Sequence, residues 1–361
     1  MKKTRDMQLD FVRVVATFFV MSVHFFLKTG FYKQQIIGWE SFVQILFRSL
    51  FMTCVPLFII LSGYLLNYRN INIKHFLSIR KVVFQYFLCT ILLFIFDVMK
   101  GWRVASCQSF VDNLVSFGQY SWYIKKYVLL FIMIPFINTF FRKVKNKKTC
   151  QISLLVLAMI ILIPTTFELA GVGGGQRVCD TLLKISDKLY TVLYYSIGVY
   201  YYYYKDEFIV LKSKILLMSL MGTLLTASAV AYLRYVNNTY LWENWNSYNG
   251  VFVFLSAAIL FLLLLRANLS GVKDGLVGKI IEKFSKISIY IYLLSYIFDN
   301  IYYEMFEKID MPVFTTIKYP LIPVLVFVSA YFMGELVNLV FKNVDNKFEM
   351  IIKKRGSIIE N

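Results

Sequence analysis

Long apolar runs constrain this chain more than any other feature. About ten segments stay apolar over the roughly 17 to 25 residues that a helix needs to cross a bilayer. Of all residues, 58% are hydrophobic and only 17% are charged, and a soluble domain cannot bury so large an apolar share. We therefore predict one all-α polytopic membrane domain over residues 1–361, with about ten transmembrane helices, at 9–29, 42–66, 82–99, 121–141, 151–167, 188–204, 215–233, 250–265, 287–303 and 317–341.

The strong positive charge follows the same topology. The net charge is +18, which taken alone would suggest a nucleic-acid partner. When the chain alternates across the bilayer from a cytoplasmic N-terminus, most of the 39 Lys and Arg residues fall in the inner segments and the two termini. This is the positive-inside bias. We therefore predict cytoplasmic termini, a multi-pass protein of the inner (plasma) membrane, the lipid bilayer as a partner and no nucleic-acid partner.

Two ionisable residues interrupt the first span and make it the leading candidate for function. Arg13 and His24 are eleven residues apart, so a helix places them about 20° from each other in rotation and about 16 Å apart along its axis. Asp10 and Thr17 flank Arg13 on the same face. We interpret this face as a polar track through the span. The simpler alternatives are that Arg13 snorkels to the inner headgroups and that His24 makes an inter-helix hydrogen bond.

Two further stretches carry unusual polar groups. Ser62 and Gly63 lie near the end of the second span, where small residues favour close helix packing. The fourth span opens with Trp122 and Tyr123, followed about one turn deeper by Lys125 and Lys126. Interfacial aromatics and snorkelling lysines account for part of this pattern.

Five cysteines show no metal-binding spacing, so we expect no metal.

These stretches together resemble the acyltransferase-3 family of bacterial membrane proteins. The order and spacing of the motifs match over nearly the whole chain, although Ser295 stands where many relatives have His. The matching residues are Leu9, Asp10, Arg13 and His24 in the first span, Phe58, Ser62 and Gly63 in the second, Arg80 and Lys81 in the basic segment that follows, and Trp122, Tyr123, Ile124 and Pro135 in the fourth.

The resemblance implies a membrane O-acetyltransferase. It would move an acetyl group from acetyl-CoA, the acyl-donor substrate, to a sugar hydroxyl of an envelope or exported polysaccharide such as capsule, O-antigen or exopolysaccharide. The implied catalytic residues are His24 as general base or transient acyl carrier, Arg13 to orient the donor or stabilise the oxyanion, and Asp10 to hold Arg13. Candidate carbohydrate- or substrate-binding residues are Ser62, Trp122, Tyr123 and Lys125.

A basic inner loop is the candidate site for the phosphates of acyl-CoA. Arg69, Lys74, Arg80 and Lys81 supply its charges, and guanidinium groups pair well with phosphate. The positive-inside bias alone explains the same residues equally well.

Two rival functions remain open. A transporter or flippase for polysaccharide precursors also fits many spans with an intramembrane Arg and His, although no inverted repeat is evident. A scaffold subunit of a polysaccharide-synthesis complex is the second rival. It would keep its activity when His24 is replaced.

Overall fold

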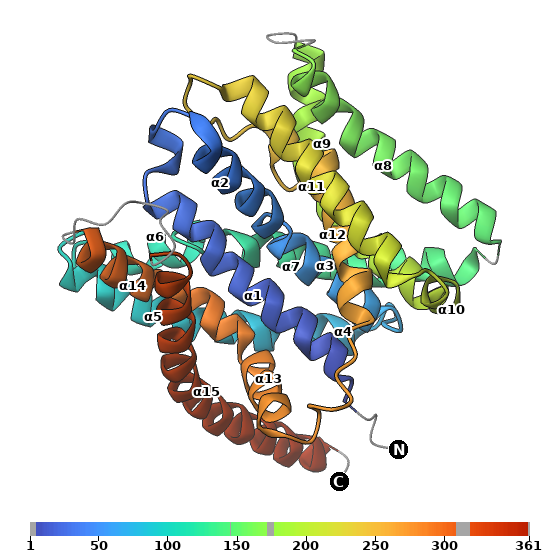
Figure 1. The fold of residues 1–361 in the computed structure, drawn as a ribbon. Coiled ribbons are helices and arrows are strands. Elements are labelled where there is room, and N and C mark those ends of the chain that lie inside the picture. The colour runs from blue at the N-terminus through green and yellow to red at the C-terminus, as the bar shows by residue number, and fades with distance from the viewer. Residues whose placement is uncertain (1–4, 145, 172–176, 308–317, 360–361) are drawn as a thin grey trace.

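The computed structural model describes residues 5–144, 146–171, 177–307 and 318–359. Within these residues the fold is helical, with isolated β-bridges and no strands, which confirms the all-α prediction (Figure 1). The α-helices are α1 (Met7–Lys28), α2 (Gly38–Phe51), α3 (Cys54–Leu66), α4 (Ile73–Ser78), α5 (Arg80–Met99), α6 (Cys107–Ser116), α7 (Trp122–Lys143), α8 (Lys147–Leu169), α9 (Arg177–Tyr203), α10 (Lys205–Ile209), α11 (Ser213–Tyr235), α12 (Val251–Leu265), α13 (Leu276–Lys286), α14 (Ser288–Glu307) and α15 (Lys318–Ile359), and the short 3₁₀ helices are η1 (Phe31–Lys33) and η2 (Asn244–Asn246).

Eight segments of the described chain are long and apolar enough to cross a membrane, so the protein is a polytopic membrane protein as predicted. The two other expected spans, 188–204 and 287–303, fall in α9 and α14, which are helices but are not among these eight. The eight segments are Met7–Lys33, Gly38–Leu66, Ile73–Met99, Trp122–Lys143, Lys147–Leu169, Ser213–Tyr235, Asn244–Leu265 and Tyr319–Asn343.

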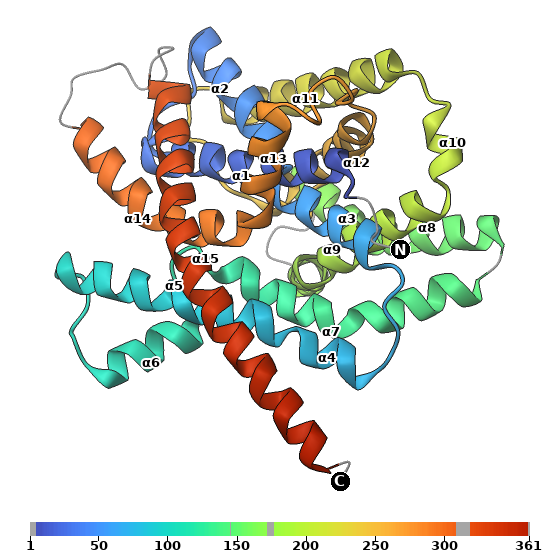
Figure 2. The same cartoon turned by 90° about the horizontal axis from the view of Figure 1, so that it is seen from below.

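Helix α1 runs through the middle of the bundle. Asp6 caps its start by accepting a hydrogen bond from the backbone N–H of Gln8 at 3.0 Å, and the chain turns away beyond Lys28 at Gly30, whose φ is 76°. The helix packs against α2, α3, α12, α13, α14 and α15, and both views show it near the centre of the molecule with other helices on either side (Figures 1 and 2). Its polar residues Asp10, Thr17, Ser22 and His24 are therefore buried among other helices.

The outer helices present apolar side chains outward. In the most apolar stretch of α8, 22% of the residues are buried, whereas 67% are buried in the corresponding stretch of the span that contains α1. In water such a surface would be unfavourable, but in a bilayer it faces lipid tails. The exposed large side chains of α8 are Ile152, Leu155, Val156, Met159, Ile160, Ile163 and Phe167.

The first and last helices reach the same end of the molecule. The start of α1 and the end of α15 are both at the bottom of Figure 1. This arrangement agrees with termini on the same side of the membrane. Their cytoplasmic placement remains a prediction from the distribution of Lys and Arg.

Two glycines allow α3 and α9 to touch backbone to backbone. A Cβ added to Gly63 would lie 2.1 Å from the carbonyl oxygen of Tyr195, and one added to Gly198 would lie 2.0 Å from that of Ile60. The small-residue pair at Ser62 and Gly63 thus marks a close helix contact, as its composition suggested. The partner glycine on α9 follows only from the packing.

We expect Gly198→Ala to destabilise the protein by about 1–3 kcal/mol, because the added methyl group meets backbone atoms that cannot move aside. The matched control is Gly222→Ala in α11, where an added Cβ would have no neighbour within 4 Å. That change should be neutral or stabilising, since alanine favours helix. Thermal unfolding of both variants in detergent measures the difference. Equal unfolding temperatures for the two would contradict the close-packing interpretation.

Candidate functional site

His24 is bonded to a buried carboxylate on a distant helix. Its Nδ1 lies 2.9 Å from Oδ2 of Asp299 in α14. Asp299 is 0% exposed and His24 is 6% exposed. When Asp299 is ionised it can only accept a hydrogen bond, so Nδ1 of a neutral His24 donates to it and Nε2 keeps its lone pair. The pair has the geometry of a general base with its orienting acid.

Asp299 was not among the site residues predicted from the sequence, although a signal was present. It is the one Asp, Glu, Lys or Arg in the expected span 287–303. Ionisable residues in spans are functional candidates by default. The bond to His24 depends on how α1 and α14 pack, and that could not be read from either segment alone.

Aromatic side chains hold the imidazole in place. The ring of Tyr120 lies over that of His24, with centroids 3.7 Å apart. The backbone carbonyl of Tyr120 accepts a hydrogen bond from the hydroxyl of Tyr292. The Tyr120 and Tyr296 rings lie at about right angles with centroids 5.3 Å apart, and the Tyr296 hydroxyl donates to Asp97 at 3.1 Å. The orientation of His24 is thus fixed from two sides.

A small cavity adjoins His24. Its volume is about 130 Å³, and we call it the His24 cavity. Its wall is rich in aromatic rings, and Trp122 stacks on Tyr248 with centroids 5.6 Å apart. The lining residues are Val20, Val23, His24, Leu27, Cys54, Val55, Trp122, Trp242, Tyr248 and Tyr292.

A much larger cavity adjoins Arg13, with a volume of about 1000 Å³. We call it the Arg13 cavity. Four cationic and two acidic side chains line it, which leaves an excess of positive charge. This size and charge suit a large anionic ligand. The charged lining residues are Arg5, Asp6, Asp10, Arg13, Lys205 and Lys286.

The closest partner of Asp10 is Arg5, which sequence reasoning did not consider. Arg5 pairs with both carboxylate oxygens of Asp10, with Nη2 at 2.8 Å from Oδ1. The nearest contact from Arg13 Nη1 to Asp10 is 3.8 Å. Ser285 joins the two groups, since its hydroxyl accepts from Arg13 at 3.1 Å and donates to Asp10 at 2.7 Å. The hydrogen bond to Asp10 raises the pKa of Arg5.

An apolar neck separates the two cavities. Val20, Val55 and Tyr292 line both of them. Thr17, expected in a polar track, is buried and donates its hydroxyl to the carbonyl of Arg13 at 2.7 Å. The predicted face of α1 therefore carries Arg13 and His24, but an apolar side chain interrupts the track between them.

The substrate-binding candidates are divided between the cavities. Trp122 lines the His24 cavity, whereas Ser62 and Tyr123 line the Arg13 cavity. Lys125 is exposed and lines neither of the two. Its neighbour Lys126 pairs with Asp187, with Nζ at 2.8 Å from Oδ1.

The basic loop predicted to bind phosphates lies outside the wall of the Arg13 cavity. Helix α5 contributes Val82, which directly follows Lys81, and Gln85, one turn further on, to that wall. The four candidates, none of which is a lining residue of this cavity, are Arg69, Lys74, Arg80 and Lys81.

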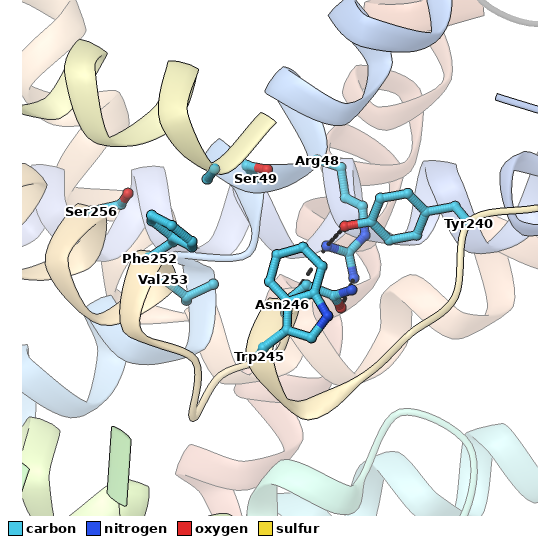
Figure 3. A pocket seen from close by; sticks show the side chains of 9 residues that line it. Arg48, Ser49, Tyr240, Trp245, Asn246, Phe252, Val253 and Ser256 are labelled. Atoms are coloured by element: carbon cyan, nitrogen blue, oxygen red, sulfur yellow. Dashed lines mark hydrogen bonds between the residues drawn. The ribbon is translucent and has the colours of Figure 1, made fainter. Parts of the chain in front are cut away.

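A fully buried arginine supports the aromatic wall. Arg48 of α2 is 1% exposed and donates to the hydroxyls of Tyr32 at 2.8 Å and Tyr240 at 3.0 Å. It also bonds the backbone and side-chain oxygens of Asn246 (Figure 3). Its guanidinium lies 5.0 Å from the ring centroid of Trp242. Arg48 thus fixes the segment that brings Trp242 to the His24 cavity.

Comparison with known proteins gives one match. The sequence model of the acyltransferase-3 family, described as an acyltransferase domain, matches residues 7–340, nearly the whole chain. No curated protein and no solved structure matches the chain.

Proposed function

The chain belongs to the acyltransferase-3 family and is a membrane acyltransferase, and from this premise we propose that it moves an acetyl group from acetyl-CoA to a sugar hydroxyl of an envelope or exported polysaccharide. The observation that carries the proposal is the His24–Asp299 pair beside one cavity, with a basic cavity on the other side of a shared neck. A cytosolic donor and an exported acceptor place such an enzyme in the inner membrane.

The Arg13 cavity is the proposed donor site. The phosphates of CoA need cations, and this cavity has Arg5, Arg13, Lys205 and Lys286 on its wall. Arg13 lies about 16 Å along α1 from His24, too far to stabilise an oxyanion at the imidazole. Of the two roles that the resemblance implies for Arg13, orienting the donor is therefore the one we propose.

The His24 cavity is the proposed meeting point of donor thioester and acceptor hydroxyl. Indole and phenol rings provide flat apolar faces for a sugar ring, and Trp122, Trp242 and Tyr248 supply them. Such a wall supports a carbohydrate acceptor.

His24 supplies the proton transfer in the proposed reaction. The hydroxyl gives its proton to Nε2 as its oxygen attacks the thioester carbonyl carbon. The C–S bond then breaks, and CoA leaves as the thiol after the imidazolium returns the proton. In the alternative, Nε2 attacks first and carries the acyl group before the sugar receives it. In either of these two reactions, Asp299 accepts a hydrogen bond from the N–H at Nδ1 of His24.

We expect the double change Arg13→Gln and Lys205→Gln to raise the apparent KM for acetyl-CoA about 10-fold or more, because charged hydrogen bonds to phosphate would be lost in ground and transition states alike. Initial rates of CoA release by purified protein in lipid nanodiscs, with an acceptor glycan present, measure this. The control is Lys125→Gln, which removes an exposed charge outside both cavities.

The same KM measurement tests whether the basic loop binds the phosphates of acetyl-CoA. The change Arg80→Gln with Lys81→Gln should also raise the KM if this loop binds the phosphates, as its charges predict. If the loop variant raises the KM and the cavity variant does not, the donor site proposed for the Arg13 cavity is wrong. An unchanged KM in the loop variant would assign the loop to membrane topology.

Transport remains the rival function, because two cavities joined by a closed neck also suit alternating access. Purified protein should form acetylated glycan and free CoA in detergent, where no transport is possible. Movement of a labelled precursor across a vesicle membrane, without CoA release, would favour the transporter. A scaffold subunit would show neither activity.

A further inference from the structure

We propose that the apolar neck selects the acyl group: it admits small uncharged acyl groups to His24 and excludes acyl groups that end in a carboxylate. This inference rests on the proposed function, since it concerns the path of the acyl group from the Arg13 cavity to His24. It assigns a specificity role to Val20, Val55 and Tyr292, the residues that line both cavities.

Val20 lies on the line between the two polar residues of α1. It follows Arg13 by seven residues and precedes His24 by four, so all three share one face of the helix. Val20 is 4% exposed, and Val55, which faces the same cavities from α3, is 3% exposed. An acyl group that moves between the cavities therefore passes these two side chains.

The neck has little freedom to adapt. A valine in a helix keeps essentially one χ1 rotamer, because its branched Cβ meets the preceding turn. The Tyr292 hydroxyl donates to the carbonyl of Tyr120. The rings of Tyr292 and Tyr123 lie at about right angles, with centroids 6.0 Å apart. With that hydroxyl engaged elsewhere, the neck presents mainly hydrocarbon.

Charge decides which acyl group can pass. A methyl group loses nothing polar when it enters a hydrocarbon neck, whereas a carboxylate loses its hydration and finds no compensating partner. The cations of the Arg13 cavity add to the difference, since Arg13, Lys205 and Lys286 would hold an acyl carboxylate behind the neck. Acetyl and propionyl groups should therefore reach His24, and succinyl groups should not.

The experiment compares acetyl-CoA with succinyl-CoA as donors for the purified protein and its acceptor glycan. We expect the kcat/KM of the wild type for acetyl-CoA to exceed that for succinyl-CoA by about 100-fold or more. In the double variant Val20→Thr with Val55→Thr, hydroxyl groups enter a neck of unchanged width. This ratio should then fall about 10-fold, because a hydrogen bond to a charged group offsets part of the desolvation.

Val12→Thr is the matched control. Val12 lies on the same helix and is 0% exposed, but it lines neither cavity. Its substitution should leave the donor ratio unchanged. Equal use of both donors by the wild type, or an equal change of the ratio in the control and the neck variant, would overturn the neck proposal while leaving acetyl transfer intact. A wild-type protein that uses neither donor would instead overturn the proposed function.

Discussion

His24→Ala and His24→Gln should abolish glycan acylation while the protein still folds and inserts into the membrane. Imidazole is the side chain most often used as a general base near neutral pH, and few other side chains can replace it. Loss of a general base typically costs about 10²–10⁴-fold in rate, and loss of an obligatory acyl carrier should cost more. Glutamine keeps some hydrogen bonding without useful basicity, so it separates packing from chemistry.

The chain provides a matched control in its other histidine. His75 is 1% exposed, its Nε2 lies 2.9 Å from the carbonyl oxygen of Phe131, and it lines neither cavity. His75→Gln should keep acylation within a few-fold of wild type at equal membrane abundance. Mass spectrometry of the glycan with purified variants gives the comparison. Near-wild-type acylation by His24→Gln would mean that the imidazole is structural and that the mechanism is wrong.

Asp299→Asn should lower kcat by two to four orders of magnitude with little change in the KM for acetyl-CoA. The amide can donate to Nδ1 and so stabilise the tautomer that has its proton on Nε2, where the lone pair is needed. In a Ser–His–Asp triad the same change lowers kcat about 10⁴-fold for this reason. The KM for acetyl-CoA should stay unchanged because Asp299 lines neither cavity.

Asp97→Asn is the control for removing a buried carboxylate. Asp97 is 3% exposed and bonds Arg103 and Tyr296, not His24. Its replacement should cost much less in kcat, since it reaches the imidazole indirectly, through Tyr296 and through Gln119, which precedes Tyr120 in the chain. Equal losses in the Asp97 and Asp299 variants would show that the His24–Asp299 bond has no special role.

The sequence alone determined the class of fold and the helix at the centre of the site. Apolar runs of bilayer length report helices directly, because each depends only on residues within the run. The eleven-residue spacing of Arg13 and His24 placed them on one face of α1 by helical geometry, and each lines one of the two cavities. Ser62 and Gly63 likewise marked a close helix contact before its partner was known.

The tertiary structure decided what those residues face. Asp299 is 275 residues from His24, and Arg5 is the closer partner of Asp10 where the sequence suggested Arg13. The neck joins valines from α1 and α3 to a tyrosine from α14. Helical periodicity fixes the face of the helix on which a side chain lies. Which helix lies opposite that face depends on how the helices are arranged in the bundle, and no local pattern in a single sequence encodes that arrangement.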